Sequence, residues 1–155
     1  VVRERAVIGI DTNLLVYAAN DQCPEHARCR ELLEQWRTRT SIWYVTWGIL
    51  YGFLRITTHP RVMPQPWDII HAWQFLEALI ASPGLNILTE TERHAEAARE
   101  VLREASQFAG NLISDVHIAV LMREHGIRTI YTHDVDFHRF PFLDVQDPLR
   151  QKTGS

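Results

Sequence analysis

Short apolar runs alternate with longer segments in which apolar residues recur every three or four positions. The short runs are mostly apolar rather than strictly alternating, which is typical of strands buried on both faces. They fall at residues 6–10, 42–45, 86–88, 127–132 and, more weakly, 144–146. Residues 11–13, Asp-Thr-Asn, bound the first run and indicate that a helix begins directly after it.

The longer segments predict helices with recognisable ends. Thr46 is expected to cap a helix that runs to Thr57, because Pro60 keeps the residue before it out of helical geometry. Ser114 is expected to cap a helix that ends at Gly126, a residue suited to the position after a helix. Further helices are predicted over residues 24–39, from Pro66 to Pro83, and over residues 90–108. The last of these carries one apolar face made of Ala95, Ala98, Val101, Leu102, Ala105 and Phe108.

Strands that alternate with helices predict an α/β fold with a parallel sheet covered on both faces. The chain of 155 residues fits a single domain over residues 1–150 with a short tail at 151–155, and it contains no internal repeat or flexible linker. In such folds, ligands bind outside the carboxyl ends of the strands. Residues that directly follow strands are therefore the first candidates for a site.

Composition excludes several classes of protein. Hydrophobic residues make up 46% and charged residues 23%, which rules out a disordered or fibrous chain. Uninterrupted apolar runs stay well below the roughly 18 residues of a membrane span, and the start of the chain lacks a signal-peptide pattern. Cys23 and Cys29 are expected to be free thiols, so we expect a cytoplasmic protein.

The charge of the chain gives no bulk argument for nucleic-acid binding, because the formal net charge is −3. Of the 16 basic residues, 15 are Arg, and only Lys152 is Lys. Arginine suits phosphate because its planar fork binds two oxygens at once. Codon bias in a GC-rich genome accounts for the same excess.

Four acids fall at places that a parallel sheet would bring together. Asp11 follows the first strand, Asp134 and Asp136 follow the strand at 127–132, and Asp115 lies in the first turn of a helix. Converging carboxylates repel one another unless a cation neutralises them. Oxygen ligands with few imidazoles suit Mg²⁺ or Mn²⁺, and such an ion can activate water for attack on a phosphodiester.

Each acid also has a purely structural interpretation. Asp11 suits a helix cap, Asp115 suits the positive end of a helix dipole, and Asp134 and Asp136 suit turns. His133 and His138 around the last two acids invite a zinc or iron site or a phosphohydrolase dyad, but no second histidine cluster supports this. His117, two residues after Asp115, is expected to face solvent.

Three acidic segments resemble the motifs of PIN domains. They are Ile-Gly-Ile-Asp-Thr-Asn at 8–13, Gly-Asn-Leu-Ile-Ser-Asp at 110–115 and Thr-His-Asp-Val-Asp-Phe-His-Arg-Phe at 132–140. The stretch Phe-Leu-Arg-Ile-Thr-Thr-His-Pro-Arg at 53–61 resembles the corresponding part of VapC-type toxins. The likeness extends from about residue 7 to residue 149, and four segments in this order are specific.

The resemblance implies a three-layer α/β/α, Rossmann-like fold with a mostly parallel central sheet. It also implies a Mg²⁺- or Mn²⁺-dependent endoribonuclease toxin with an RNA substrate, tRNA being one candidate, a cognate antitoxin and a homodimer. Carried over by motif, the catalytic and metal-binding acids are Asp11, Asp115, Asp134 and Asp136. The polar residues that orient them are Thr12, Asn13 and Thr132, and the residues expected to meet RNA phosphate are Arg55 and Arg139.

One position departs from the family pattern. VapC-type toxins usually carry Glu directly before the Phe-Leu-Arg stretch, and this chain has Gly52 there. The sequence leaves open an active enzyme with fewer metal ligands, a natural pseudo-enzyme, and a replacement that arose because the intact toxin harmed its expression host. The alternative to a nuclease is therefore a disabled PIN-fold module that binds RNA or an antitoxin without cleavage.

Overall fold

The computed structural model describes residues 7–38, 42–105 and 108–150. Five strands form one sheet: β1 (Ile8–Ile10), β2 (Trp43–Thr46), β3 (Leu85–Leu88), β4 (Thr129–Tyr131) and β5 (Asp144–Gln146). Their order is β3-β2-β1-β4-β5, and all four neighbouring pairs are parallel. The predicted C-terminal tail and the parts of predicted elements that fall in four stretches lie outside the described residues. These stretches are 1–6, 39–41, 106–107 and 151–155.

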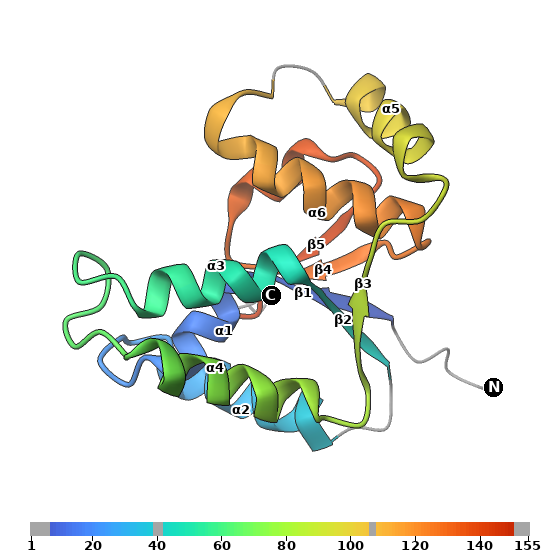
Figure 1. Cartoon of the computed structure of the whole chain (residues 1–155). Helices are drawn as coiled ribbons and strands as arrows, with labels where there is room; N and C mark the ends of the chain where they lie inside the picture. The colour runs from blue at the N-terminus through green and yellow to red at the C-terminus, as the bar shows by residue number, and fades with distance from the viewer. Residues whose placement is uncertain (1–6, 39–41, 106–107, 151–155) are drawn as a thin grey trace, which may run out of the picture.

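Six α-helices flank the sheet: α1 (Thr12–Ala19), α2 (His26–Thr38), α3 (Trp47–Thr57), α4 (Ile69–Ile80), α5 (His94–Glu104) and α6 (Ile113–Glu124). Short 3₁₀ helices, η1 (Gly110–Leu112) and η2 (Val135–Arg139), precede α6 and follow β4. In Figure 1 the strands lie between the pair α5 and α6 and the group α1 to α4. This arrangement confirms the predicted α/β/α fold.

Local sequence explains where the helices begin and end. The Thr46 side chain accepts a hydrogen bond from the backbone N–H of Ile49 at 3.1 Å, so it caps α3 as expected. Gly126 follows α6 with a φ of 71°, a conformation that glycine adopts without steric cost. The helix expected at Pro66 begins instead at Ile69, because Asp68 caps it by accepting from the His71 N–H at 2.9 Å.

Two details of the predicted helices are wrong. Ser114 does not cap α6, because η1 runs directly into that helix and its N-cap position is Leu112. Helix α5 covers less than residues 90–108 and buries Ala97 and Val101, whereas Leu102 is half exposed. Of the predicted apolar face, Val101 and Ala105 are buried and Ala98 and Phe108 pack against the core, so the prediction fails only at Ala95 and Leu102.

The core surrounds the central strand. All three residues of β1 are buried, and Ile10 has no exposed surface. Phe53 of α3 and Phe137 of η2 are also fully buried, so the segments around the sheet's carboxyl edge are anchored by large apolar side chains. Within the described ranges, no helix combines the length and the apolar character that crossing a membrane requires.

Candidate metal centre

The carboxyl ends of the two central strands place Asp11 and Asp134 beside each other. Strands β1 and β4 are parallel neighbours, and the Asp11 N–H continues their ladder by donating to the Tyr131 carbonyl at 3.0 Å. The chain leaves β1 toward α1 and β2 on one side, whereas β4 lies on the other side of β1. Such a reversal of strand order opens a crevice at the sheet edge.

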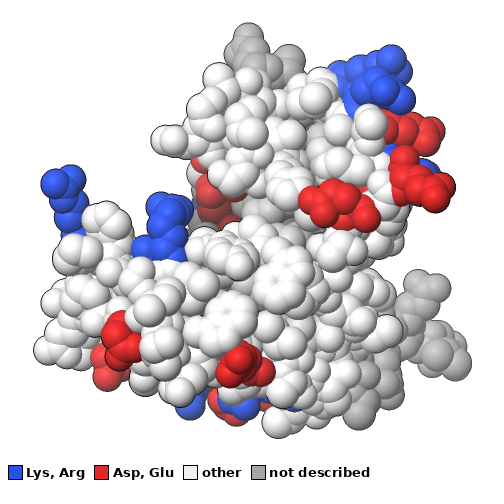
Figure 2. Space-filling model, in the orientation of Figure 1, with Lys and Arg blue, Asp and Glu red and all other residues white. Residues whose placement is uncertain are grey.

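A pocket of about 360 Å³ occupies this edge, and all four predicted acids line it. Thr12, Asn13, Gly52, Arg55 and His117 contribute to its wall as well. Figure 2 shows acidic side chains in the hollow between the two helix groups, with basic side chains beside it on the α3 side. The structure therefore gathers acids from the residue after β1, from α6 and from the segment after β4.

Three of the acids are close enough to share one ion. Asp115, Asp134 and Asp136 each offer a carboxylate oxygen, and these oxygens lie within 4.8 Å of one another. Asp11 lines the same pocket, but both of its oxygens already accept hydrogen bonds. Oδ1 accepts from the Thr12 N–H at 2.7 Å, and Oδ2 accepts from the Thr132 hydroxyl at 2.7 Å.

The hydroxyl of Thr132 connects most of the polar groups at the sheet edge. It donates to Asp11 and accepts from the backbone N–H of Asp134 at 2.9 Å, and the Asn13 amide donates to it at 3.4 Å. The Asn13 carbonyl oxygen also accepts from the His133 N–H at 3.4 Å. Because Thr132 is only 1% exposed, water does not compete with these bonds.

Without a cation, the negative charges of this cluster destabilise the folded protein. Burial raises the pKa of Asp11 to about 6, although the hydrogen bonds from Thr132 and Thr12 oppose the rise. Burial, followed by repulsion from Asp11, Asp134 and Asp136, raises the pKa of Asp115 to about 7. Both carboxylates would be stabilised by a positive ion in the pocket.

The donor set fits a hard divalent cation. The converging ligands are carboxylate oxygens, the type that Mg²⁺ and Mn²⁺ prefer, and the pocket leaves room for water on the ion. Arg55 lies on the rim of this pocket with an exposed side chain. The chemistry of the residues therefore agrees with the predicted metal.

The other predicted residues occupy different places. Thr12 contributes its backbone N–H to Asp11, whereas its hydroxyl donates to the Ile49 carbonyl at 3.2 Å. Arg139 lies outside the pocket lining, and its Nε is 3.5 Å from Oδ1 of Asp136. Gly52, the position at which the resemblance to VapC-type toxins led us to expect Glu, lines the pocket from the middle of α3.

Sequence reasoning missed two features near this site. The first is η2, in which the Asp134 side chain accepts from the Asp136 N–H at 2.9 Å and thereby sets the spacing of the two acids. The second is His117, which lines the pocket and bonds Glu90 at 2.8 Å. The sequence gave no signal of the contact between His117 and Glu90, because the two residues lie on segments far apart in the chain.

Comparison with known proteins assigns this sequence to a family. The family model for the PIN domain matches residues 8–143. Ribonuclease VapC48 of Mycobacterium tuberculosis is 31% identical over 139 residues, which cover 90% of this chain and 95% of the relative. Ribonuclease VapC43 of the same species is 35% identical over 144 residues, covering 93% and 97%.

A solved structure shares the fold. VapBC2 from Rickettsia felis, crystallised with a DNA fragment from its promoter, matches with a TM-score of 0.64 at 17% identity. The match covers 90% of this chain and 97% of that one. At this identity, the likeness establishes the arrangement of the strands and helices.

Proposed function

Because the chain belongs to the PIN domain family and is related over most of its length to VapC ribonucleases, we propose that it is a metal-dependent endoribonuclease of the VapC type. The observation that carries the proposal is the convergence of Asp115, Asp134 and Asp136 within one pocket that Asp11 also lines. Four carboxylates in one cavity repel one another and oppose folding, and a bound cation would relieve that repulsion.

Asp115, Asp134 and Asp136 would hold Mg²⁺ or Mn²⁺. Asp11, which lines the same pocket, would add a fourth negative charge near the ion. When bound, the ion lowers the pKa of a water ligand and offsets negative charge on the phosphodiester. Asn13 and Thr132 keep Asp11 and Asp134 in place through their hydrogen bonds. Arg55, exposed at the rim, is positioned to bind an RNA phosphate, whereas Arg139 would first have to leave Asp136.

A cleavage assay on total tRNA tests the proposal. The parent chain is expected to cut RNA with Mn²⁺ and to stop when EDTA is added. Asp134→Asn is expected to lose at least 100-fold in rate, while Asp144→Asn, which changes an exposed acid on β5, keeps the parent rate. Cleavage that persists in EDTA or in Asp134→Asn would contradict the proposal.

A module that binds without cutting remains the second candidate, and Gly52 is the observation that favours it. Gly52 adds no carboxylate to the pocket wall at the position where the resemblance led us to expect Glu, so an ion there would have fewer anionic ligands. RNA retention by the parent chain without any cleavage at millimolar Mn²⁺ would support the module. Cleavage abolished by Asp134→Asn would exclude it.

We further propose a cognate antitoxin, a homodimer and a cytoplasmic location, supported by the relationship to VapC proteins. A toxin that degrades RNA needs a partner that covers its acidic pocket. Co-expression with a candidate antitoxin tests this. The complex is expected to co-purify and to suppress tRNA cleavage, and a freely active mixture would oppose it.

A further inference from the structure

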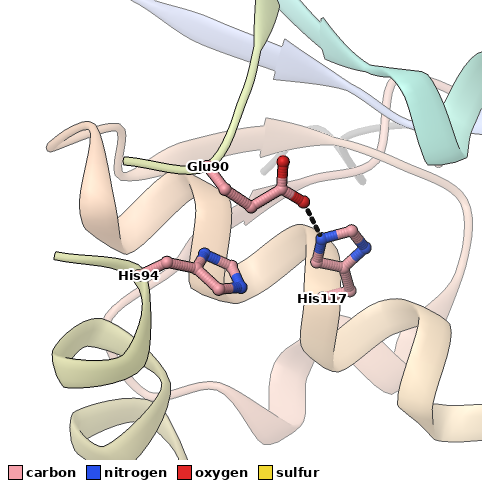
Figure 3. A group of neighbouring side chains, drawn as sticks. All are labelled: Glu90, His94 and His117. Carbon is pink, nitrogen blue, oxygen red and sulfur yellow. Dashed lines mark hydrogen bonds and ion pairs between the residues drawn. The ribbon is translucent and has the colours of Figure 1, made fainter. Parts of the chain in front are cut away.

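A second group of metal-ligating side chains lies outside the acidic cluster. Glu90 follows β3, His94 opens α5 and His117 lies on α6, and each offers one ligand atom. These atoms lie within 4.8 Å of one another. Figure 3 shows the three side chains converging from their separate segments. The His117 Nε2 is 2.8 Å from Oε1 of Glu90, and the rings of His94 and His117 are perpendicular with centroids 5.8 Å apart.

A buried carboxylate behind His94 holds that ring for a ligand. The side chain of Glu124 on α6 is 0% exposed, and both of its oxygens are 3.2 Å from Nδ1 of His94. An ionised carboxylate only accepts hydrogen bonds, so Nδ1 of His94 is the donor to Glu124, and in the neutral ring Nε2 then keeps its lone pair for a metal ion. Metal-binding histidines are commonly oriented by a carboxylate in this way.

Glu124 also fixes the segment that carries Glu90. Its Oε1 accepts from the Thr91 backbone N–H at 3.2 Å, so one buried carboxylate orients His94 and anchors the residue next to Glu90. On the other side, the His125 ring bonds the Thr89 carbonyl at 2.7 Å. Glu90 is thus held between two anchored neighbours before any ligand arrives.

The donor set differs in kind from that of the acidic cluster. Two imidazoles and one carboxylate are the ligands of open zinc sites, whereas an all-carboxylate set suits Mg²⁺ or Mn²⁺. We propose that Glu90, His94 and His117 form a separate site for Zn²⁺ or a similar borderline divalent ion, completed by water. Ligands at 2.0–2.1 Å around a tetrahedral ion are roughly 3.3 Å apart, so the group must contract by no more than about 1.5 Å.

The contraction falls on side chains that are free to move. Glu90 and His117 are exposed and about half accessible, and their ligand atoms are already 2.8 Å apart. Rotation about their own bonds can therefore move them toward His94 without a change in the core. His94, the half-buried member, is the one that Glu124 already holds. An ion in this position would cross-link the segment after β3 to α5 and α6.

A zinc titration of the tag-free Asp134→Asn chain in excess Mg²⁺ tests the site, because this variant weakens the acidic cluster, which His117 also borders. One equivalent of Zn²⁺ is expected to bind at micromolar concentration or tighter. Glu124→Gln should weaken binding roughly 10–100-fold by removing the orienting charge, and His94→Gln at least as much. His71→Gln, a surface change on α4, should bind like its parent.

Two further measurements keep the test decisive. Zinc is expected to raise the melting temperature of the Asp134→Asn chain but not that of its His94→Gln or His117→Gln derivatives, and circular dichroism without zinc checks that these derivatives fold. Co²⁺ should give a visible absorption band that is lost with either histidine. Zinc affinity unchanged by both histidine substitutions, or no stoichiometric binding in the parent, would show that Glu90 and His117 form only an ion pair.

Discussion

Gly52 on α3 and Thr12 on α1 approach so closely that a Cβ at position 52 would lie 3.2 Å from Oγ1 and 3.3 Å from Cγ2 of Thr12. Contacts this short require the neighbour to shift by a few tenths of an ångström. Thr12 resists such a shift in part, because its hydroxyl donates to the Ile49 carbonyl. The glycine thus brings α1 and α3 together at the wall of the acidic pocket.

Gly52→Glu is expected to tighten Mn²⁺ binding and to speed RNA cleavage, because it adds a carboxylate to the pocket wall. Its helix propensity exceeds that of Gly by somewhat under 1 kcal/mol, which offsets the displacement of Thr12. We therefore expect the stability to change by no more than about 1 kcal/mol. Calorimetric Mn²⁺ titration and tRNA cleavage measure the effect, with Gly52→Gln as the uncharged control. Equal values for Glu and Gln would show that position 52 does not reach the ion.

Asp115→Asn is expected to stabilise the metal-free protein and to weaken metal binding. The substitution removes a charge that burial and three neighbouring acids oppose, as the raised pKa of about 7 shows. We expect a melting temperature higher by a few degrees, since 1 kcal/mol corresponds to about 2–4 °C for a chain of this size. Asp21→Asn, at an exposed acid, is the control. A clear loss of stability would mean that Asp115 acts mainly at the helix start.

The stability of the metal-free protein is expected to fall as pH rises between about 5 and 8. Asp11 and Asp115 have pKa values raised to about 6 and about 7, so the folded state binds their protons more tightly than the unfolded state. The stability that these two protons contribute is complete below the unfolded-state pKa of 3.8. It is lost as the pH rises through the folded-state pKa values of about 6 and about 7. Thermal unfolding from pH 5 to 8, with and without Mn²⁺, measures this. The slope should be smaller with Mn²⁺ and in Asp115→Asn, and parallel curves would refute the assignment.

Thr132→Val is expected to cost about 1–3 kcal/mol of stability, because it leaves the Asp134 N–H without its buried acceptor. It should also raise the pKa of Asp11 further, since the Thr132 hydroxyl is the larger of the two hydrogen bonds that lower it. Denaturant unfolding measures the first effect, and the pH dependence of cleavage measures the second. Thr132→Ser keeps the hydroxyl and should restore most of both. A serine variant as impaired as the valine variant would assign the effect to packing.

The acids at strand ends could be predicted because their positions follow from one topological rule. Asp11 and Asp134 each follow a buried strand, and parallel neighbours put their carboxyl ends at one edge. The fold class was predictable for the same reason, since apolar strands alternating with amphipathic helices leave few other arrangements.

Contacts between side chains far apart in the chain were not predictable from periodicity. Arg139 pairs with Asp136 one turn away in η2, a helix that the sequence pattern did not reveal. Glu90, His94 and His117 meet only because α5 packs on α6, and nothing in their spacing encodes that contact. The cap of α6 was misplaced because η1 supplies the first turn instead of a side chain.

The pairing of β1 with β4 determines when the acidic pocket can form during synthesis of the chain. Ile8 and Thr129 are paired residues, so about 120 residues must be made before the central strand acquires this neighbour. A nascent chain that ends before β4 carries Asp11 and Asp115 but neither Asp134 nor Asp136, and Thr132 is also missing from it. Such partial chains therefore lack two of the four acids that line the pocket. The acidic pocket can therefore assemble only after Asp136 has been made, and a ribosome that is still translating the preceding residues faces an incomplete site.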